Sequence, residues 1–531
     1  MTISRTILCT AAGLTLGLSL GASADPGTPE RLFLQKVSTH SAVVKWRGGE
    51  GDRVCYSRKI KDLRKANWPR CVSGVETEGG HLEALLTGLA PDKGYYYSVG
   101  GYVDDQMYFN TAPNSNKPPK DGNTHILIVG DSGTITDGVE EGKPEGDHPG
   151  EAAAVLAGYG IYSAANGGEA VDLFLALGDN AYEAGTDDEW QASFFELYTG
   201  ILKGAFTIPT IGNHEMGFGP IDACFFVPIP CGIQNIPLAG VSAAADQADY
   251  DGNGDFQPDG TGMPYLDIFS LPAAGESGGV PSGTEQYYSV DYGNVHLVSL
   301  DSQLTARDEA GRASMEQWLI ADLSANSRDW TIVIFHHPPY TKGENHDSDD
   351  AEDSPFDRPI WDMRNEFTPV FEEYGVDVVY SGHSHSYERT YYIKDHTGTS
   401  DTFSTAEHAE LVDGDPEQPV SGRPGEPYYQ LSPTSGGVDD RVVYTVAGSS
   451  GKADKGGDNF GITDDEEWLR HAAHIEQPLS ETKCDDPEGC REGLRGLGVK
   501  GSVVIDADRD SLRARFVDVN GEVLDEFTIN R

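Results

Sequence analysis

Residues 376–385 read Val-Asp-Val-Val-Tyr-Ser-Gly-His-Ser-His, an apolar run that ends in a glycine and two histidines. An apolar run with turn residues directly after it predicts a buried strand that leads into a loop. The apolar runs 126–129, 173–177, 206–211 and 331–335 end in the same way, at Gly130-Asp131, Gly178-Asp179-Asn180, Gly212-Asn213-His214 and His336-His337. Longer segments separate these runs, as in an α/β layered fold, where ligands gather beyond the carboxyl ends of strands. We therefore expect these polar residues to form one site.

Each of these residues has an ordinary structural explanation when it is taken alone. A Gly-Asp pair after a strand is commonly a turn, and a single histidine in an apolar run is more often a core residue than a ligand. We interpret His296, within the run 294–300, as such a core residue. Together, however, carboxylate, amide and imidazole groups suit divalent or trivalent cations, and one carboxylate shared by two cations is typical of two-metal hydrolases.

Five blocks of the sequence resemble, in order, those of the purple acid phosphatases, a family of calcineurin-like metallophosphoesterases. The blocks are Asp131, Gly178-Asp179-Asn-Ala-Tyr182, Gly212-Asn213-His214-Glu215, Val333-Ile-Phe-His336 and Gly382-His383-Ser-His385. The segments 386–390 and 503–529 are also similar to that family. Tyr182 is the discriminating residue, because the wider metallophosphoesterases share the other blocks but lack this tyrosine.

The resemblance implies a set of metal ligands. Asp131, Tyr182 and His385 would hold a first ion together with Asp179, which would bridge to a second ion. The residues that would hold the second ion are Asn213, His336 and His383. A phenolate oxygen favours ferric iron at the first position, and the second ion would be Fe, Zn or Mn in the divalent state.

Two histidines are candidates for contacting the substrate and protonating the leaving group. His214 follows the Asn213 ligand directly, and the equivalent histidine of the family contacts the substrate phosphate. His346 lies on the loop after His336, where plant members carry a further active-site histidine; the alternative is a solvated residue among aspartates. We interpret His337 as part of a rigid turn with the two prolines that follow it.

The chain of 531 residues is long enough for two domains. Residues 1–24 have the positive start, apolar stretch and small-residue end of a signal peptide. Residues 25–118 read as a β-sandwich similar to a fibronectin type III domain, with Leu89, Pro91 and Tyr95 in its Leu-x-Pro-x-x-x-Tyr stretch. Residues 119–531 form the expected catalytic domain, after a linker rich in proline and asparagine.

Cysteine usage and charge limit the partners. Without residues 1–24, six cysteines remain in three sequence-local pairs: Cys55/Cys71, Cys224/Cys231 and Cys484/Cys490. An even count in an exported chain favours disulfides, paired here by proximity, over a thiolate metal site. The formal net charge of −48 argues against a nucleic acid or an anionic membrane as partner. It also repels phosphate esters, so an enzyme acting on them needs bound cations.

Two acidic, Gly-rich stretches, 134–165 and 222–283, read as surface insertions around the site. The second contains Asp249, Asp251, Asn253 and Asp255, which place oxygen atoms at alternate positions, as a calcium loop requires. Because Gly260 stands where such a loop wants a glutamate, a calcium site and a plain acidic turn both remain open.

These observations predict an α/β (α+β) metallophosphoesterase core of two packed β-sheets flanked by helices, preceded by an all-β, fibronectin type III-like sandwich. The expected activity is hydrolysis of small phosphate monoesters by a metal-activated hydroxide, with an acidic optimum, in a secreted or periplasmic protein. Two alternatives remain: a phosphodiesterase or nucleotide hydrolase on the same scaffold, and a metal-binding adhesion protein without turnover. The sequence does not indicate the natural substrate or the oligomeric state.

Overall fold

The computed structural model describes residues 27–64, 70–133, 151–182, 185–216, 263–303, 309–352, 354, 357–430, 440–454, 467–477 and 493–531. The proposed signal peptide, the calcium loop 249–255 and the cysteine pairs Cys224/Cys231 and Cys484/Cys490 lie outside these residues. None of the helices in the described part of the chain is long and apolar enough to cross a bilayer.

The larger sheet has the strand order β17-β22-β21-β20-β9-β10-β11-β1-β2-β6-β5 among the described residues. Its strands are β17 Tyr428–Tyr429, β22 Val523–Asn530, β21 Ser511–Asp518, β20 Gly501–Ala507, β9 Thr124–Val129, β10 Leu173–Ala176, β11 Phe206–Pro209, β1 Glu30–Gln35, β2 Ser41–Arg47, β6 Leu82–Thr87 and β5 Val75–Glu76. Strands β9, β10 and β11 are parallel neighbours, with Leu173 paired to Ile126 on one side and to Phe206 on the other. Their carboxyl ends therefore lie at one edge of the sheet.

The second sheet of the core has the order β12-β13-β14-β15-β18-β16-β19 in the described part of the chain. Its strands are β12 Tyr288–Tyr292, β13 Val295–Ser299, β14 Trp330–Ile334, β15 Val378–Ser381, β18 Val443–Ala447, β16 Tyr387–Arg389 and β19 Gly496–Leu497. Strands β13, β14, β15 and β18 run parallel to one another, and β12 and β16 are antiparallel to them. The two predicted sheets, and the five strands that the apolar runs predict, are thus confirmed.

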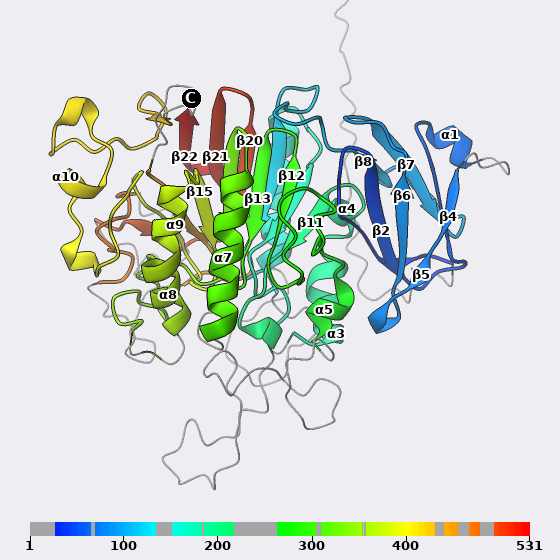
Figure 1. Cartoon of the computed structure of the whole chain (residues 1–531), viewed down its shortest axis with the longest axis horizontal. Coiled ribbons are helices and arrows are strands. Elements are labelled where there is room, and N and C mark those ends of the chain that lie inside the picture. Colours follow the sequence, from blue (N-terminus) through cyan, green and yellow to red (C-terminus); the bar gives the residue numbers. More distant parts are fainter. Residues whose placement is uncertain are drawn as a thin grey trace, which may run out of the picture.

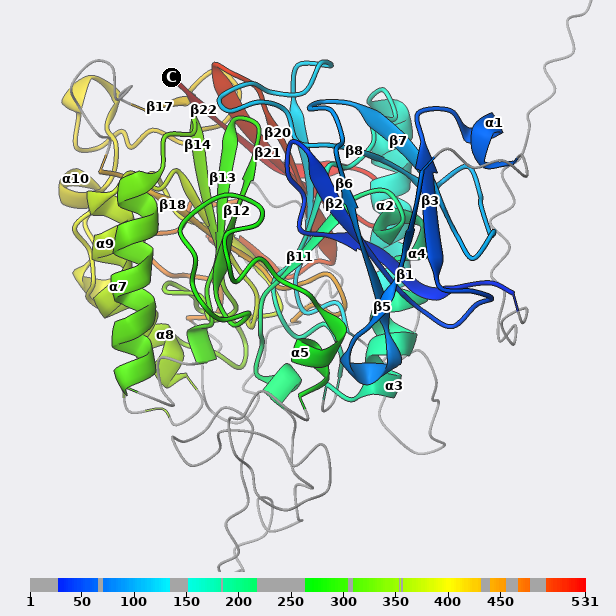
Figure 2. The ribbon, with the colours of Figure 1, turned by 45° about the vertical axis from the view of Figure 1, so that its right-hand side comes forward.

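Side chains on successive residues of the second sheet point to two different cores, because strand side chains alternate between faces. Ile332 and Val378 share one core with Ile128 and Leu175 of the larger sheet. Their neighbours face the second core, which contains Val333, Val379, Met315, Leu319 and Phe371. This second core lies under the helices α7 Glu309–Ala325, α8 Arg358–Asp362 and α9 Thr368–Glu373, which Figure 2 shows along one flank. Strands that are buried on both faces explain why these runs are almost continuously apolar.

The first 85 or so described residues form a sandwich at the opposite end of the molecule, drawn in blue in Figure 1. A sheet of β4 Cys71–Ser73, β3 Arg53–Ser57, β7 Gly94–Val99 and β8 Tyr108–Asn110 packs on β1, β2, β6 and β5. The Tyr95 hydroxyl accepts the N–H of Ala90 at 3.0 Å, which fixes the turn before β7. The structure therefore has the predicted all-β, fibronectin type III-like unit.

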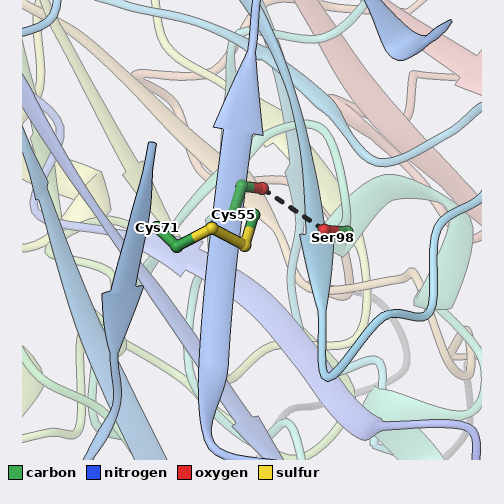
Figure 3. The surroundings of a disulfide bond; sticks show 3 residues. All are labelled: Cys55, Cys71 and Ser98. Atoms are coloured by element: carbon green, nitrogen blue, oxygen red, sulfur yellow. Dashed lines mark hydrogen bonds between the residues drawn. A yellow bond between two sulfur atoms is a disulfide. The ribbon is translucent and has the colours of Figure 1, made fainter. Parts of the chain in front are cut away.

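The predicted pairing of Cys55 with Cys71 is confirmed by a disulfide between facing residues of β3 and β4 (Figure 3). The Ser98 hydroxyl of β7 donates to the Cys55 carbonyl oxygen at 3.5 Å. The bond thus closes one edge of the sandwich.

The sandwich and the core share a sheet, because β1 pairs in parallel with β11 through Leu34 and Phe206. Short helices lie near this junction and elsewhere on the surface. They are α1 Ile60–Leu63, α3 Asp187–Glu189, α4 Thr199–Leu202, α5 Pro264–Ile268 and α10 Thr405–His408. The domain boundary at residue 118 stays a prediction, since the sheet is continuous across it.

The interpretation of 134–165 as a surface insertion is wrong for its second half. Residues 151–165 form helix α2, Glu151–Ala165, which packs on β20 and β21. Gly158 allows this contact, because a Cβ there would lie closer than 3.0 Å to the backbone of Asp518 and Val519. The alanine-rich sequence of this half is helix-forming and buries Val155 and Tyr162.

The end of the second predicted insertion, 222–283, also belongs to the core. Helix α5 buries Tyr265 and Ile268, and Phe269 and Leu271 are buried after it. The Tyr265 hydroxyl donates to the Pro209 carbonyl oxygen at 3.2 Å, which connects α5 to the end of β11. The interpretation as a surface insertion is therefore wrong for residues 264–271.

His296 is a core residue, in agreement with the sequence. Its Nδ1 lies 2.9 Å from Asp291 Oδ1 and its Nε2 lies 2.9 Å from Asp322 Oδ2. Burial alone would lower the pKa of His296, but the hydrogen bonds to Asp291 and Asp322 raise it to about 9.

This raised pKa predicts a pH-dependent contribution to stability. A histidine whose folded pKa is above its unfolded value of about 6.5 stabilises the fold fully below that pH and loses the contribution as pH rises toward 9. We expect the difference in free energy of unfolding between the native chain and His296→Gln to shrink by about 3 kcal/mol between pH 6 and pH 9. Urea denaturation of both proteins across this range measures it, and a difference that is independent of pH would contradict the prediction.

Candidate metal centre

Three candidate residues follow the neighbouring strands β9, β10 and β11. Asp131, Asp179 and Asn213 each come directly after a glycine at the carboxyl end of one of these strands. The second sheet contributes His336 after β14, and His383 and His385 after β15. The structure brings these groups to one place between the sheet edges.

The backbone at this site adopts conformations that side chains usually avoid. Asp131, Asp179 and His383 have φ values of 53°, 52° and 71°, in the left-handed region. Each such residue costs on the order of 1 kcal/mol or more, and such residues cluster at functional sites. Three of them among the residues predicted as ligands therefore indicate that side-chain placement is maintained against local backbone preference.

Glycines leave room for the side chains that meet here. An added Cβ at Gly178, Gly212 or Gly382 would lie closer than 3.0 Å to His336 Nδ1, Asp179 Oδ1 or Asp131 Oδ2, in that order. The glycine before each polar residue is thus required by the side chain of a neighbouring strand end.

One half of the site consists of Asp131, Tyr182 and His385, beside Asp179. The Tyr182 hydroxyl donates to Asp179 Oδ2 at 3.1 Å and lies 3.3 Å from Asp131 Oδ1. His385 Nε2 lies 3.8 Å from Asp131 Oδ1, and its Nδ1 faces Asp454 Oδ1 at 3.4 Å. Four oxygen or nitrogen donors thus converge.

The other half consists of Asn213, His336 and His383. The Asn213 Oδ1 atom lies 3.0 Å from His336 Nε2 and 3.0 Å from His383 Nδ1. His336 Nδ1 lies 2.9 Å from the Leu177 carbonyl oxygen, which can only accept, so Nδ1 carries the proton and Nε2 is free to face the site. His336 Nε2 also lies 3.3 Å from Asp179 Oδ2, so Asp179 borders both halves.

Glu215 holds the two loops that carry Asp179 and Asn213. Its carboxylate accepts the backbone N–H groups of Asp179 at 2.8 Å, Asn180 at 2.7 Å and Gly212 at 2.6 Å. Burial raises the pKa of Glu215 to about 7, and the charge of Asp179 adds to the rise. This acidic residue of the third sequence block therefore positions the backbone and does not point at the metal site.

Burial and close charges shift the titration of the site residues. Burial raises the pKa of Asp131 well above its ordinary value, and the nearby Asp179 adds to the rise. Burial would also raise the pKa of Asp179, but His336 and His214 hold it well below the ordinary value. Burial raises the pKa of Tyr182 well above its ordinary value, and the charges of Asp179 and Asp131 add to the rise. The negative charges of Asp131 and Asp179 repel each other at this distance, and a bound cation would remove this repulsion.

The positions and chemistry of the donor atoms show which metal ions would fit the site. Ligand atoms of Asp131, Asp179 and His336 lie within 4.8 Å of one another. Carboxylate, phenol, amide and imidazole donors suit ferric iron and divalent Fe, Zn or Mn, and the cysteines within the described ranges, Cys55 and Cys71, are joined in a disulfide. The residues therefore fit a pair of such cations.

Both predicted substrate-contacting histidines lie beside the metal ligands. The His214 ring centroid lies 4.1 Å from that of Tyr182, and His214 Nε2 lies 3.8 Å from Asp179 Oδ2. The His346 ring stacks on His383 with centroids 3.7 Å apart. Their roles toward substrate stay predictions.

His337 is buried, and the structure gives it specific polar neighbours. Its Nδ1 lies 2.8 Å from the Ser302 hydroxyl and its Nε2 lies 3.2 Å from Gln303 Nε2. Its ring lies 4.3 Å from that of His383. His337 thus packs against the ligand candidate His383 and helps to fix the orientation of its ring.

Sequence reasoning did not find three residues that contact the site. Asp357 Oδ1 lies 2.8 Å from His346 Nδ1 and 3.2 Å from His383 Nε2, so it orients both rings. Asp454 faces His385, and Lys452 lies 4.6 Å from the Tyr182 ring centroid. A signal for Lys452 was present, because 443–447 is another apolar run and is followed by Gly448-Ser-Ser-Gly-Lys452.

The first domain is tied to the loop that carries Asp179 and Tyr182. The buried Arg31 guanidinium binds both carboxylate oxygens of Asp187, at 2.6 and 2.7 Å, and Arg47 binds Asp187 at 2.7 Å. Asp187 begins α3, which continues into a π-helix, Trp190–Phe195. Within it, the Ser193 hydroxyl donates to the Asn180 carbonyl oxygen at 2.8 Å. The ion pairs thus brace this loop from the sandwich side.

Comparison with known proteins agrees with this geometry. The family model of the calcineurin-like phosphoesterases matches residues 124–387. Purple acid phosphatase 23 of Arabidopsis thaliana is 27% identical over 341 residues, covering 60% of this chain and 60% of that protein. The chain therefore matches less than two thirds of the length of this relative.

Two solved structures have the same fold. The purple acid phosphatase PPD1 from yellow lupin (Lupinus luteus) seeds aligns with a TM-score of 0.58 and 17% identity, over 96% of this chain and 75% of that chain. PhoD aligns with a TM-score of 0.52 and 14% identity, over 96% of this chain and 92% of that chain. At these identities the likeness concerns the fold, and it confirms the predicted metallophosphoesterase core.

Proposed function

Because this chain belongs to the purple acid phosphatases, within the calcineurin-like phosphoesterases, we propose that it hydrolyses phosphate monoesters at a pair of metal ions. Metal-dependent hydrolysis of phosphoesters is the activity of the domain family. The proposal adds the monoester as substrate class and two cations that share one carboxylate.

The position of Asp179 carries this proposal. Its Oδ2 atom lies 3.1 Å from the Tyr182 hydroxyl and 3.3 Å from His336 Nε2, while its Oδ1 accepts the His214 N–H at 2.9 Å. One carboxylate therefore faces both donor groups. This supports the ligand sets that the resemblance implies, with Asp131, Tyr182 and His385 on one side and Asn213, His336 and His383 on the other.

When bound, the cations supply hydroxide near neutral pH and neutralise charge on the phosphoryl oxygens. The chain itself orients the groups around them. Asp357 holds His383 through Nε2 so that Nδ1 faces the site, and Asp454 holds His385 through Nδ1 so that Nε2 faces it. The Leu177 carbonyl oxygen does the same for His336.

We assign the proton for the leaving oxygen to one of the two histidines at the edge of the site. His214 is part-buried beside Tyr182 and Asp179, and His346 receives its orientation from Asp357. A general acid must reach the ester oxygen directly or through one water.

The disulfide supports the proposed secreted or periplasmic location, because disulfides persist in oxidising compartments.

The substrate class is tested by comparing turnover of 4-nitrophenyl phosphate and bis(4-nitrophenyl) phosphate by the metal-loaded protein. We expect a higher kcat/KM for the monoester. A higher value for the diester would favour the phosphodiesterase alternative, and no turnover of either would favour a binding protein.

The metal at the first position is tested through Tyr182→Phe. The native protein, purified with iron, is expected to have a broad visible absorption band from phenolate bound to ferric iron, and the variant is expected to lack it. The variant retains the apolar ring that packs on His214, so metal content measured in parallel separates a lost band from a lost ion. A colourless, active, zinc-only protein would contradict ferric iron here.

A further inference from the structure

Strand β18 delivers a further loop to the metal centre. It is the parallel neighbour of β15 and is followed by Gly448-Ser-Ser-Gly-Lys452. The Ser450 N–H donates to the Gly130 carbonyl oxygen at 3.1 Å, and the Gly130 N–H donates to the Ser450 hydroxyl at 3.2 Å. The loop that ends in Lys452 is therefore bonded directly to the loop that carries Asp131.

Lys452 lies beside the ligand candidate Tyr182. Its Nζ lies 4.6 Å from the ring centroid of Tyr182. Two residues later, the Asp454 N–H donates to the His385 carbonyl oxygen at 2.8 Å, and the Asp454 carboxylate faces the His385 ring. The backbone contacts of Ser450 and Asp454 thus fix the position of the Lys452 backbone, from which the half-buried side chain reaches the Tyr182 ring.

The ammonium of Lys452 lies near the carboxylates of Asp131 and Asp454, but among the described residues no carboxylate lies at ion-pair distance from it, although the chain carries 86 acidic residues. Lys342 provides a contrast, because it binds Asp347, Asp349 and Glu467 at 2.9 to 3.0 Å. A half-buried ammonium that lies beside a metal centre and forms no direct ion pair can bind an anion that comes from solution.

We propose that Lys452 binds a phosphoryl oxygen of the substrate and makes the site prefer dianionic monoesters over monoanionic diesters. The proposal rests on the proposed function. A lysine ammonium is a compact point charge that binds phosphate oxygens, and its attraction grows with the charge of the anion. The His214 ring borders the same phenol, so Lys452 and His214 both offer nitrogen donors beside Tyr182.

The alternative is that Lys452 only packs on the aromatic ring of Tyr182. A cation over a phenol ring stabilises by about 0.5–1 kcal/mol at an exposed site, without any dependence on phosphate. Such a contact would influence the orientation of Tyr182 and the metals, but it would not influence the affinity for a free anion.

The test compares Lys452→Gln with Lys452→Arg and with the control Lys120→Gln, whose side chain is 65% exposed and lies in the linker region. Inorganic phosphate is titrated into each metal-loaded protein by calorimetry, and metal content and the visible spectrum are recorded on the same samples. For Lys452→Gln we expect the Kd of phosphate to rise by about 10-fold or more, the loss typical of a hydrogen bond to a charged group. Lys452→Arg keeps the positive charge, and Lys120→Gln removes a charge at another place. Both variants should therefore have a Kd of phosphate within about 3-fold of that of the native protein.

The ratio of kcat/KM for 4-nitrophenyl phosphate to that for bis(4-nitrophenyl) phosphate should fall in Lys452→Gln by about the same factor as phosphate affinity. An unchanged Kd and ratio with full metal content would overturn the proposal, and so would a weaker Kd that is explained by lost metal. If the native protein hydrolyses neither ester, the proposed function fails, while the phosphate titration still decides whether Lys452 binds the anion.

Discussion

Asp179→Asn is expected to lower kcat for 4-nitrophenyl phosphate by about 10³-fold or more, since even one group that stabilises transition-state charge contributes on this scale. Asp179 is buried, and it is the carboxylate that faces both donor groups. The amide has nearly the same shape but offers one neutral oxygen where the carboxylate offers two charged ones. The measurement is steady-state kinetics at saturating metal.

The matched control for this prediction is Asp188→Asn, an exposed residue of α3 that makes the same chemical change near the same loop. It should retain native kinetics. Full activity of Asp179→Asn would show that this carboxylate does not share the cations, and it would remove the basis of the proposed ligand sets.

Asp525→Asn is expected to lower the free energy of unfolding by about 3–5 kcal/mol, the cost of leaving a buried charge without its partner. Asp525 of β22 binds Arg389 of β16 through both oxygens, at 2.6 and 3.1 Å, and accepts the Tyr387 hydroxyl at 2.9 Å. The Arg389 side chain is fully buried, at 0% exposure, so water cannot replace the lost carboxylate. This pair joins the two sheets of the core.

Urea denaturation of the variant and of Asp510→Asn, an exposed aspartate in the turn before β21, separates the buried charge from a general effect of the substitution. The double change Arg389→Met with Asp525→Leu should recover much of the loss, because it removes both charges. A stability of Asp525→Asn equal to that of the control would contradict this account.

The convergence of the candidate ligands could be predicted because each one follows a local pattern. A strand, a glycine and a polar residue stand together in the sequence at Asp131, Asp179, Asn213 and His383. Parallel strands then place such residues at one edge without further information. Facing side chains explain the glycines, because a Cβ at Gly178, Gly212 or Gly382 would lie closer than 3.0 Å to a side chain of another strand end.

Other parts of the site depend on contacts that no local pattern records. Asp357 belongs to a loop rich in aspartates, and only the fold shows which of them orients His383 and His346. The pairing of β1 with β11 and the binding of Asp187 by Arg31 join segments more than 150 residues apart. Composition was misleading for α2, because acidic and glycine residues before it concealed an alanine-rich helix.

The proposed arrangement, in which the Asp179 carboxylate lies between two cations, can be seen by anomalous diffraction from crystals grown with the bound metals. We expect two peaks about 3.5–4 Å apart, with the Asp179 carboxylate between them, one beside Tyr182 and the other beside Asn213. A single peak, or peaks that do not contact Asp179, would contradict it.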